Sequence, residues 1–275
     1  MYVLYLLLTT YYSLLTTPMN LRQKYIAFLT IFTKEVKRSF RTWKQTFLPA
    51  IITTVLYFLI FGSFIGSQIK DIQGVSYMMF IVPGLVMMSI LTSSFQSMLS
   101  KFYFLKFQKT IQEILISPMP AWLVVFSYLS ASMFNGFIIG ALVFSSAYFF
   151  EFIPVVHPFF ALLVVALTSI FFALLGLVNA IYAKTFDDIS IVQTFAITPL
   201  TYLGGVFYSV ALLPPFWLTI SQFNPILYMV NAFRYSILGF SDIALSTSIL
   251  VILGCIAIVF SWVLYLFKTG RGMKA

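Results

Sequence analysis

The chain has 275 residues and a formal net charge of +9, and 61% of its residues are hydrophobic while 8% are charged. Because a soluble domain carries about 25% charged residues, this composition excludes a protein whose surface is mainly in contact with water. We therefore expect one membrane domain and no sizeable cytosolic domain.

Basic residues flank apolar runs along the chain, so the positive charge predicts membrane topology and attraction to anionic lipid rather than nucleic-acid binding. The chain has one cysteine, Cys255, and one histidine, His157. This excludes a disulfide within the chain and a Cys/His metal cluster. His157 lies in a proline-containing segment and is interpreted as a loop residue.

Residues 1–18 are apolar and carry no charge. They lack the basic start and small-residue cleavage site of a signal peptide, and they are short for a membrane span. The sequence Met19-Asn20-Leu21-Arg22 is typical of a natural start. We treat 1–18 as an N-terminal extension, and N-terminal sequencing of the native protein would decide between Met1 and Met19.

Residues 19–46 are predicted to form an amphipathic helix at the membrane interface. Large apolar residues recur at steps of three and four, with lysine and arginine at the polar positions. The apolar positions are Tyr25, Phe28, Leu29, Phe32, Val36, Phe40 and Trp43. A solvated basic leader, held near the membrane only by topology, is the alternative.

Six apolar windows in the domain 47–275 have about the length needed to cross a bilayer, so we expect an all-α protein with six transmembrane helices. The windows are 47–67, 77–100, 122–150, 159–183, 189–212 and 246–267, and none contains a charged residue or histidine. If alternate connections share a side, one side holds fourteen Lys and Arg and the other holds two, Lys70 and Arg234. The positive-inside rule then predicts that residue 22 onward and the C-terminus are cytoplasmic.

The connection 101–120 is predicted to be a cytoplasmic loop that contains a short amphipathic helix, ended by Pro118 and Pro120. Its apolar face would consist of Phe107, Ile111, Ile114 and Leu115, with Glu113 among the polar positions. Such a helix can dock to a cytosolic partner. It can equally be a connector that lies on lipid headgroups.

Residues 213–240 are predicted to form a short helical hairpin. Pro214-Pro215 ends the fifth window, and Asn224-Pro225 is a turn signal between two helical patterns that are too short to cross. We expect a re-entrant pair of helices in the outer leaflet, before the last span. A surface loop with an interfacial helix is the alternative.

The segment 224–239, which reads NPILYMVNAFRYSILG, resembles the signature of ABC-2-type permeases, the membrane subunits of a class of bacterial ABC exporters. Segments 112–120 and 34–41 are similar to the cytoplasmic loop and the amphipathic lead-in of that family. The resemblance covers roughly residues 21–270. The signature positions are Asn224, Pro225, Tyr228, Ala232, Phe233, Arg234, Tyr235 and Gly239.

The resemblance implies an ABC-2 permease fold in the bacterial inner membrane, with two copies of the chain forming a pathway above two separate ATPase subunits. The loop 107–118 would be the coupling helix, contacting the ATPase through Phe107, Ile111, Glu113, Ile114 and Leu115. No Gly-x-x-x-x-Gly-Lys-Ser/Thr phosphate loop occurs in the sequence. ATP and Mg²⁺ are therefore expected on the partner ATPase, and this chain is expected to have no cofactor and no catalytic residue.

Three other classes of protein are weighed against the exporter subunit. An ion-coupled transporter usually places ionisable groups within the membrane, and the six windows have none. An intramembrane enzyme needs an activated nucleophile, and Cys255 has no acid or base in its window. A structural subunit of another complex is the third, and an ATPase encoded beside the chain would argue against it. The resemblance implies a substrate that is hydrophobic, lipid-like or a glycan, and it implies that the first, second and fifth spans form the walls of the pathway.

Overall fold

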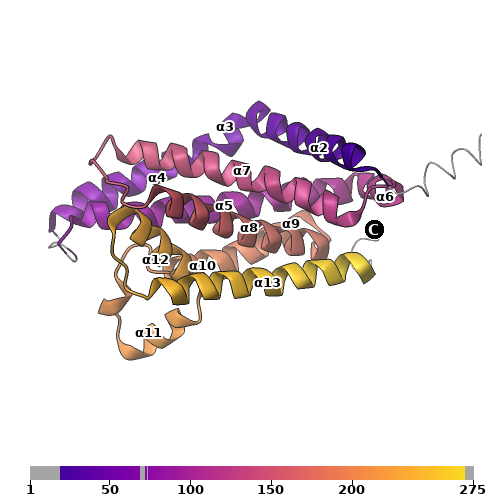
Figure 1. Cartoon of the computed structure of the whole chain (residues 1–275). Coiled ribbons are helices and arrows are strands. Elements are labelled where there is room, and N and C mark those ends of the chain that lie inside the picture. The colour runs from indigo at the N-terminus through magenta and orange to yellow at the C-terminus, as the bar shows by residue number, and fades with distance from the viewer. Residues whose placement is uncertain (1–18, 69–71, 73, 270–275) are drawn as a thin grey trace, which may run out of the picture.

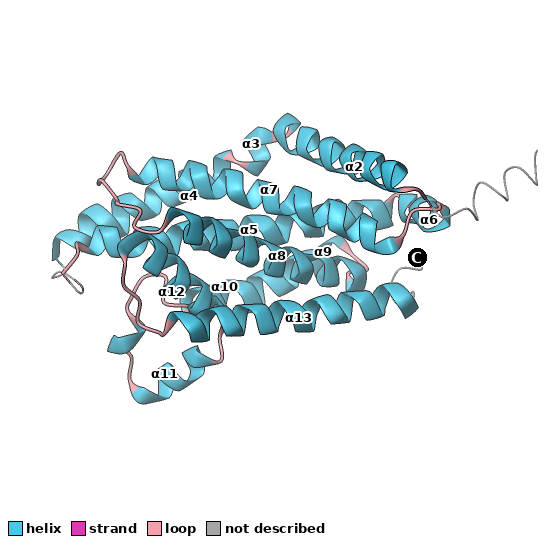
Figure 2. Ribbon diagram, in the orientation of Figure 1, coloured by secondary structure: helices cyan, strands magenta, loops and turns pink. Residues whose placement is uncertain are grey.

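The computed structural model describes residues 19–68, 72 and 74–269, and the extension 1–18 lies outside this part. The described residues are helical and contain no strand, only an isolated bridge between Ile72 and Val75 (Figure 2). The elements are α2 (Leu21–Arg41), α3 (Trp43–Thr46), α4 (Leu48–Tyr57), the π-helix η1 (Phe58–Ile65), the 3-10 turn η2 (Gly66–Gln68), α5 (Tyr77–Phe107), α6 (Thr110–Ile116), α7 (Ala121–Ala147), α8 (Pro158–Tyr182), α9 (Phe186–Val192), the π-helix η3 (Gln193–Ile197), α10 (Thr198–Tyr202), the 3-10 turn η4 (Val210–Leu212), α11 (Pro215–Gln222), α12 (Pro225–Leu238) and α13 (Leu245–Thr269).

Five helices in the described part are long and apolar enough to cross a membrane. They are Trp43–Ile65, which joins α3, α4 and η1, together with α5, α7, α8 and α13. These helices match five of the six predicted windows. Membrane crossing needs about 20 apolar residues, which is why hydropathy alone located them.

The fifth predicted window, 189–212, does not form one helix over its whole length. The successive elements α9, η3 and α10 end at Tyr202, and the chain then turns at Gly204-Gly205, where Gly205 has a φ of +71°. This backbone conformation costs glycine little, so the glycine pair ends the helix inside an apolar run. The predicted end at residue 212 is therefore wrong, and a total of six spans stays a prediction.

The second span is longer than predicted. α5 continues past residue 100 to Phe107, so Lys101 and Lys106 lie on the helix and not in a loop. The ammonium group of Lys106 donates hydrogen bonds to the carbonyl oxygens of Ile181 (2.7 Å) and Ala183 (3.0 Å). These carbonyls end α8, and a cation is favourable there because helix C-termini carry partial negative charge.

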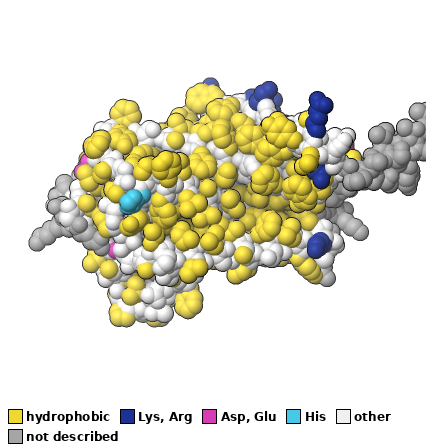
Figure 3. Space-filling view, in the orientation of Figure 1, with side chains coloured by type: hydrophobic (Ala, Val, Ile, Leu, Met, Phe, Trp, Pro, Cys, Tyr) yellow, Lys and Arg dark blue, Asp and Glu magenta, His cyan; other side chains and the backbone are white. Residues whose placement is uncertain are grey.

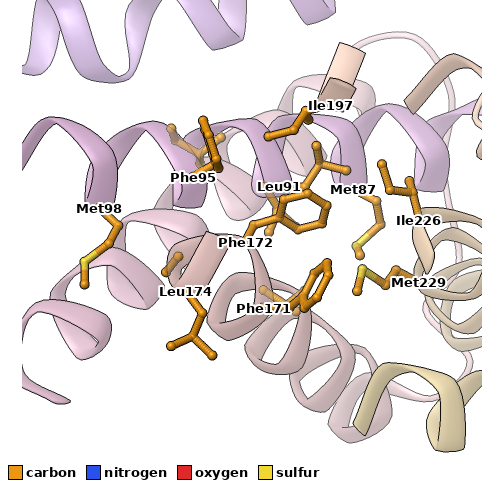
Figure 4. Close-up of a cluster of buried hydrophobic side chains, with 14 of the residues drawn as sticks. Met87, Leu91, Phe95, Met98, Phe171, Phe172, Leu174, Ile197, Ile226 and Met229 are labelled. Carbon is orange, nitrogen blue, oxygen red and sulfur yellow. The ribbon is translucent and has the colours of Figure 1, made fainter. Parts of the chain in front are cut away.

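The core lies where α5 packs against α7, α8 and α12. Figure 4 shows its centre, with Met87, Leu91, Phe95 and Met98 from α5 facing Phe171, Phe172 and Leu174 from α8, beside Ile226 and Met229 from α12. Gly176 permits a close approach of α5 to α8, because a Cβ atom there would overlap the carbonyl oxygen of Phe95. Small residues at such contacts are typical of packed membrane helices.

The predicted amphipathic helix is present as α2, which runs beside α7 (Figure 1). Ring pairs join the two helices, with centroids 5.5 Å apart for Phe28–Phe126 and 5.9 Å apart for Phe32–Phe134. The side-chain amide of Asn135 donates to the hydroxyl of Ser39 (2.9 Å). Part of the aromatic face thus packs on protein, and the location of α2 at a membrane surface stays a prediction.

The two ends of the molecule differ in charge. The start of α2, the short helix α6 and the end of α13 lie at one end, at the right of Figure 1. On the face shown in Figure 3, lysine and arginine side chains gather over α2 and at that same end, and hydrophobic side chains cover the broad middle. The orientation of these ends relative to the membrane stays a prediction.

Candidate functional site

The predicted coupling segment consists of the end of α5 and the separate helix α6. Lys109 lies between them in the left-handed conformation, with a φ of +59°, and breaks the helix. Phe107 is therefore the last residue of α5 and does not share a helical face with Ile111 and Ile114. α6 ends at Ile116, and the hydroxyl of the next residue, Ser117, donates to the carbonyl oxygen of Ile114 (2.6 Å).

The apolar face of α6 turns toward the bundle. Ile111 is only 3% exposed, and Ile114 packs beside it against the hydrophobic core. Both line a cavity of about 130 Å³, with Phe102, Met119 and Phe267 among its other walls. These two side chains are thus poorly placed for contact with a partner.

The outward face of α6 is polar. Gln112 and Glu113 are exposed, while the side chain of Leu115 lies outside the described part. Of the five predicted contact residues, Glu113 and Phe107 have described side chains that are exposed, so a partner can reach them. The coupling role itself stays a prediction for all five.

Phe107 joins the end of α5 to the start of α9. Its ring is 59% exposed and lies 6.3 Å from that of Tyr103 and 5.1 Å from that of Phe186. α9 begins there with Thr185 as its cap, and the Asp188 carboxylate accepts hydrogen bonds from the backbone N–H groups of Thr185 and Lys184, both at 2.9 Å. These hydrogen bonds lower the pKa of Asp188. α5, α8 and α9 thus meet directly beside α6.

The predicted hairpin is present as α11 and α12, separated at Asn224. The Asn224 side chain accepts a hydrogen bond from the N–H of Ile226 (3.0 Å), which caps α12, and donates one to the carbonyl oxygen of Leu200 (2.6 Å) in α10. The hydroxyl of Tyr228 donates to the carbonyl oxygen of Gln222 (2.8 Å) at the end of α11. Pro225 begins α12, where its missing N–H costs nothing. The hairpin's depth in the membrane stays a prediction.

Arg234 is fully buried at the centre of this segment, with 0% of its surface exposed. Its Nη2 donates a hydrogen bond to the carbonyl oxygen of Gly205 (2.7 Å), and its guanidinium lies over the ring of Phe80, 4.0 Å from the centroid. Asp242 is the acid that acts electrostatically on it. Arg234 thus joins α12 to α5 and to the turn that follows α10.

Asp242 fixes the other end of that turn. Its carboxylate accepts hydrogen bonds from the Ser209 hydroxyl (2.9 Å) and the Val210 N–H (3.2 Å), and its own N–H donates to the side chain of Asn231 (3.0 Å). Sequence reasoning missed Asp242, although it is the only acid that follows the Asp187-Asp188 pair. The sequence did offer one signal for this role: Asp242 is an acid that closely follows Arg234, the only arginine of the hairpin.

The remaining signature residues hold α12 in place. Ala232 and Phe233 are buried in the bundle. Tyr235 stacks on His157 with the ring centroids 5.1 Å apart, which fastens the 148–157 loop to α12. Gly239 ends the helix with a φ of +83°, a conformation that favours glycine. The signature therefore builds a fixed hairpin around one buried charge.

Comparison with known proteins matches this arrangement to a family. The profile of the ABC-2 type transporter family matches residues 26–238. The chain is 45% identical over 251 residues to the inner membrane transport permease YadH of Escherichia coli (strain K12), covering 91% of this chain and 98% of that protein. It is 26% identical over 208 residues to nodulation protein J of Rhizobium leguminosarum bv. viciae, covering 74% of this chain and 80% of that protein. The chain belongs to the ABC-2 type transporter family.

Proposed function

We propose that the chain is the membrane-spanning permease subunit of an ABC exporter and that a separate ATPase subunit drives it. Two observations support the proposal: the family match, and the short helix α6 that lies at one end of the bundle. There a short helix is fixed to the bundle by its inner face and exposes Glu113 on its outer face. ATP and Mg²⁺ would bind to the partner subunit.

The contacts around α6 provide a route by which a push from an ATPase would reach the spans. Ile111 and Ile114 connect α6 to α7 and α13 across the shared cavity. Phe107 and Lys106 connect the adjoining end of α5 to α9 and to the end of α8. A displacement of α6 would therefore be passed to several helices together, as closely packed interiors transmit strain.

The proposed setting is the inner membrane, with α6 and the C-terminus in the cytoplasm. The name of the E. coli relative and the basic residues at the α6 end support this placement. We further propose a homodimer. The span that contains α4 and η1 is strongly apolar, yet only 11% of its most apolar window is buried within one chain, which leaves it free for lipid or a second copy.

The docking face is tested by its exposed residues. Replacing Glu113 with lysine together with Phe107→Ala is expected to reduce the ATPase subunit recovered with the purified permease about tenfold, because exposed charge and aromatic contacts at an interface are lost. The matched control is Phe149→Ala, because Phe149 is 90% exposed and lies in the loop after α7, at the other end of that helix from α6. Equal recovery with all three proteins would show that the ATPase docks elsewhere.

An ion-coupled transporter is the second candidate function, and one observation favours it. Glu35 on α2 is 1% exposed, and its Oε2 atom has no hydrogen-bond partner among the described residues, although Arg38 lies 3.6 Å away. Proton-coupled carriers place such carboxylates within the membrane, so a position of Glu35 at membrane depth would favour this function. The dependence of transport on ATP or on a proton gradient separates the two functions.

A further inference from the structure

A polar cavity of about 210 Å³ lies where α2, α3, α5 and α7 meet. Its walls carry hydroxyl, amide and cationic side chains, which is unusual in a protein of this composition. The lining side chains that could bind a polar ligand include Arg38, Ser39, Ser97, Ser100, Lys101 and Asn135. Asn135 donates hydrogen bonds to Ser39 and Ser97, while its Oδ1 atom has no partner in the described part.

Lys101 is the principal feature of this cavity. Its side chain is buried, with 3% of the residue exposed, and its Nζ atom has no hydrogen-bond partner among the described residues. Burying an ammonium group without a partner is costly, so an anion or a polar ligand is expected beside it.

The charges near Lys101 leave a positive excess. Glu35 and Arg38 are the groups that act electrostatically on it, and these two already face each other at 3.6 Å. Two cations and one acid leave a net charge of +1 around the cavity. A single anionic group would balance that excess.

A second cavity, of about 320 Å³, continues from the first between α4 and α5. The two share Gln45, Thr46, Ser93 and Gln96, so they form one groove. Away from the shared wall the lining is more apolar. It consists of Pro49, Ala50, Tyr57, Leu85, Met88 and Ile139 together with the hydroxyl-bearing residues Thr53, Thr54, Ser89 and Thr92. The groove is thus charged at one end, while the other end has no charged residue and is mainly apolar.

We propose that this groove binds a single-chain anionic amphiphile, with a phosphate or carboxylate head on Lys101 and Arg38 and an alkyl chain between α4 and α5. A single alkyl chain is inferred because the volumes of both cavities are near or below the lower end of the range found for small-molecule pockets. The inference rests on the proposed function, because it names the class of substrate that the exporter would carry. Asn135 Oδ1 would accept a hydrogen bond from a hydroxyl group of the head.

Binding is tested on the purified full chain in phosphatidylcholine nanodiscs. The probe is dodecyl phosphate with a photoreactive diazirine at the end of its chain. Labelling is expected in the α4 and α5 peptides. A probe with the same tail and a neutral maltoside head is expected to label them about tenfold less, the factor for one lost charge-assisted hydrogen bond. Inorganic phosphate, which has no tail, is expected not to compete.

Variants locate the head group. Lys101→Met is expected to lower labelling by dodecyl phosphate about tenfold, while Lys101→Arg retains most of it. Lys37→Met removes the same charge from an exposed position on α2 and is expected to label like wild type. Equal labelling of Lys101→Met and wild type would overturn the proposal.

Two further comparisons keep the test decisive. If Lys101→Met does not fold, the wild-type comparison decides, and equal labelling by the anionic and neutral probes would overturn the proposal. Labelling needs no ATPase, so it can succeed even if no ATPase subunit is found. Failure of the amphiphile site and failure of the exporter function are thereby distinguishable.

Discussion

Replacing Arg234 with methionine is expected to destabilise the folded chain by roughly 1–3 kcal/mol, the usual cost of leaving a buried hydrogen-bond acceptor without its donor. Methionine fills much of the same volume but cannot donate a hydrogen bond to Gly205 or balance Asp242. The buried carbonyl oxygen of Gly205 would then be left without this donor. Loss of export is expected with it, because the turn at 203–209 would lose its direct link to α12 and keep only the one through Asp242 and Asn231.

The measurement is the melting temperature of the purified chain in detergent, followed by ATP-dependent transport. Arg22→Met, at the exposed start of α2, is the control for loss of one positive charge. Arg234→Lys is expected to recover stability only in part, because an ammonium group cannot reproduce a planar guanidinium over the Phe80 ring. An Arg234→Met protein as stable and as active as the control would remove the role given to this residue.

Replacing Gly176 with alanine is the second change with a large expected effect. The new Cβ atom would overlap the carbonyl oxygen of Phe95, so α5 and α8 would have to separate. Overpacking of this kind costs about 1–3 kcal/mol, and in this protein it would act on two helices that pack together in the core. A lower melting temperature and lower yield of folded protein are expected.

Gly254→Ala provides a matched control on α13. Nothing lies within 4 Å of a Cβ atom at that position, so the same substitution there meets no neighbour. Alanine also has the higher helix propensity, so this variant is expected to be as stable as wild type or slightly more stable. Equal melting temperatures for the two variants would show that α5 and α8 are not in close contact at Gly176.

The positions of most spans could be predicted, because a run of about 20 apolar residues rarely forms anything other than a transmembrane helix. The same rule misplaced the end of α5, since it stops a span at the first lysine. Lys106 is accommodated by the carbonyl groups of Ile181 and Ala183, more than seventy positions away in the sequence. A window of local hydropathy carries no information about such a partner.

Periodicity located the apolar face of α6 but not what covers it. A stripe that contains Ile111 and Ile114 is equally consistent with a docking surface and with packing on the chain's own bundle. The structure shows packing on the bundle, which moves the expected contact surface to Glu113 and Phe107. The break at Lys109 was also hidden, because a left-handed lysine has no distinctive sequence signal.

The signature segment was recognised from its sequence, and its two helices were predicted correctly. The environment of Arg234 was not predicted, because it depends on Phe80 and Gly205, which lie in other elements. Lys101 was likewise assigned to a loop from its charge alone. The surroundings of Arg234 and Lys101 are formed by residues from other elements, and local sequence reasoning was least informative for these two side chains.

The source of energy for transport distinguishes the proposed exporter subunit from an ion-coupled carrier. The tagged chain, purified from its native membrane, is expected to retain a subunit with a Gly-x-x-x-x-Gly-Lys-Ser/Thr loop. In proteoliposomes that complex is expected to hydrolyse ATP and to transport dodecyl phosphate even when the proton gradient is collapsed, while the chain alone does neither. Transport by the chain alone, driven by a proton gradient and indifferent to ATP, would contradict this assignment.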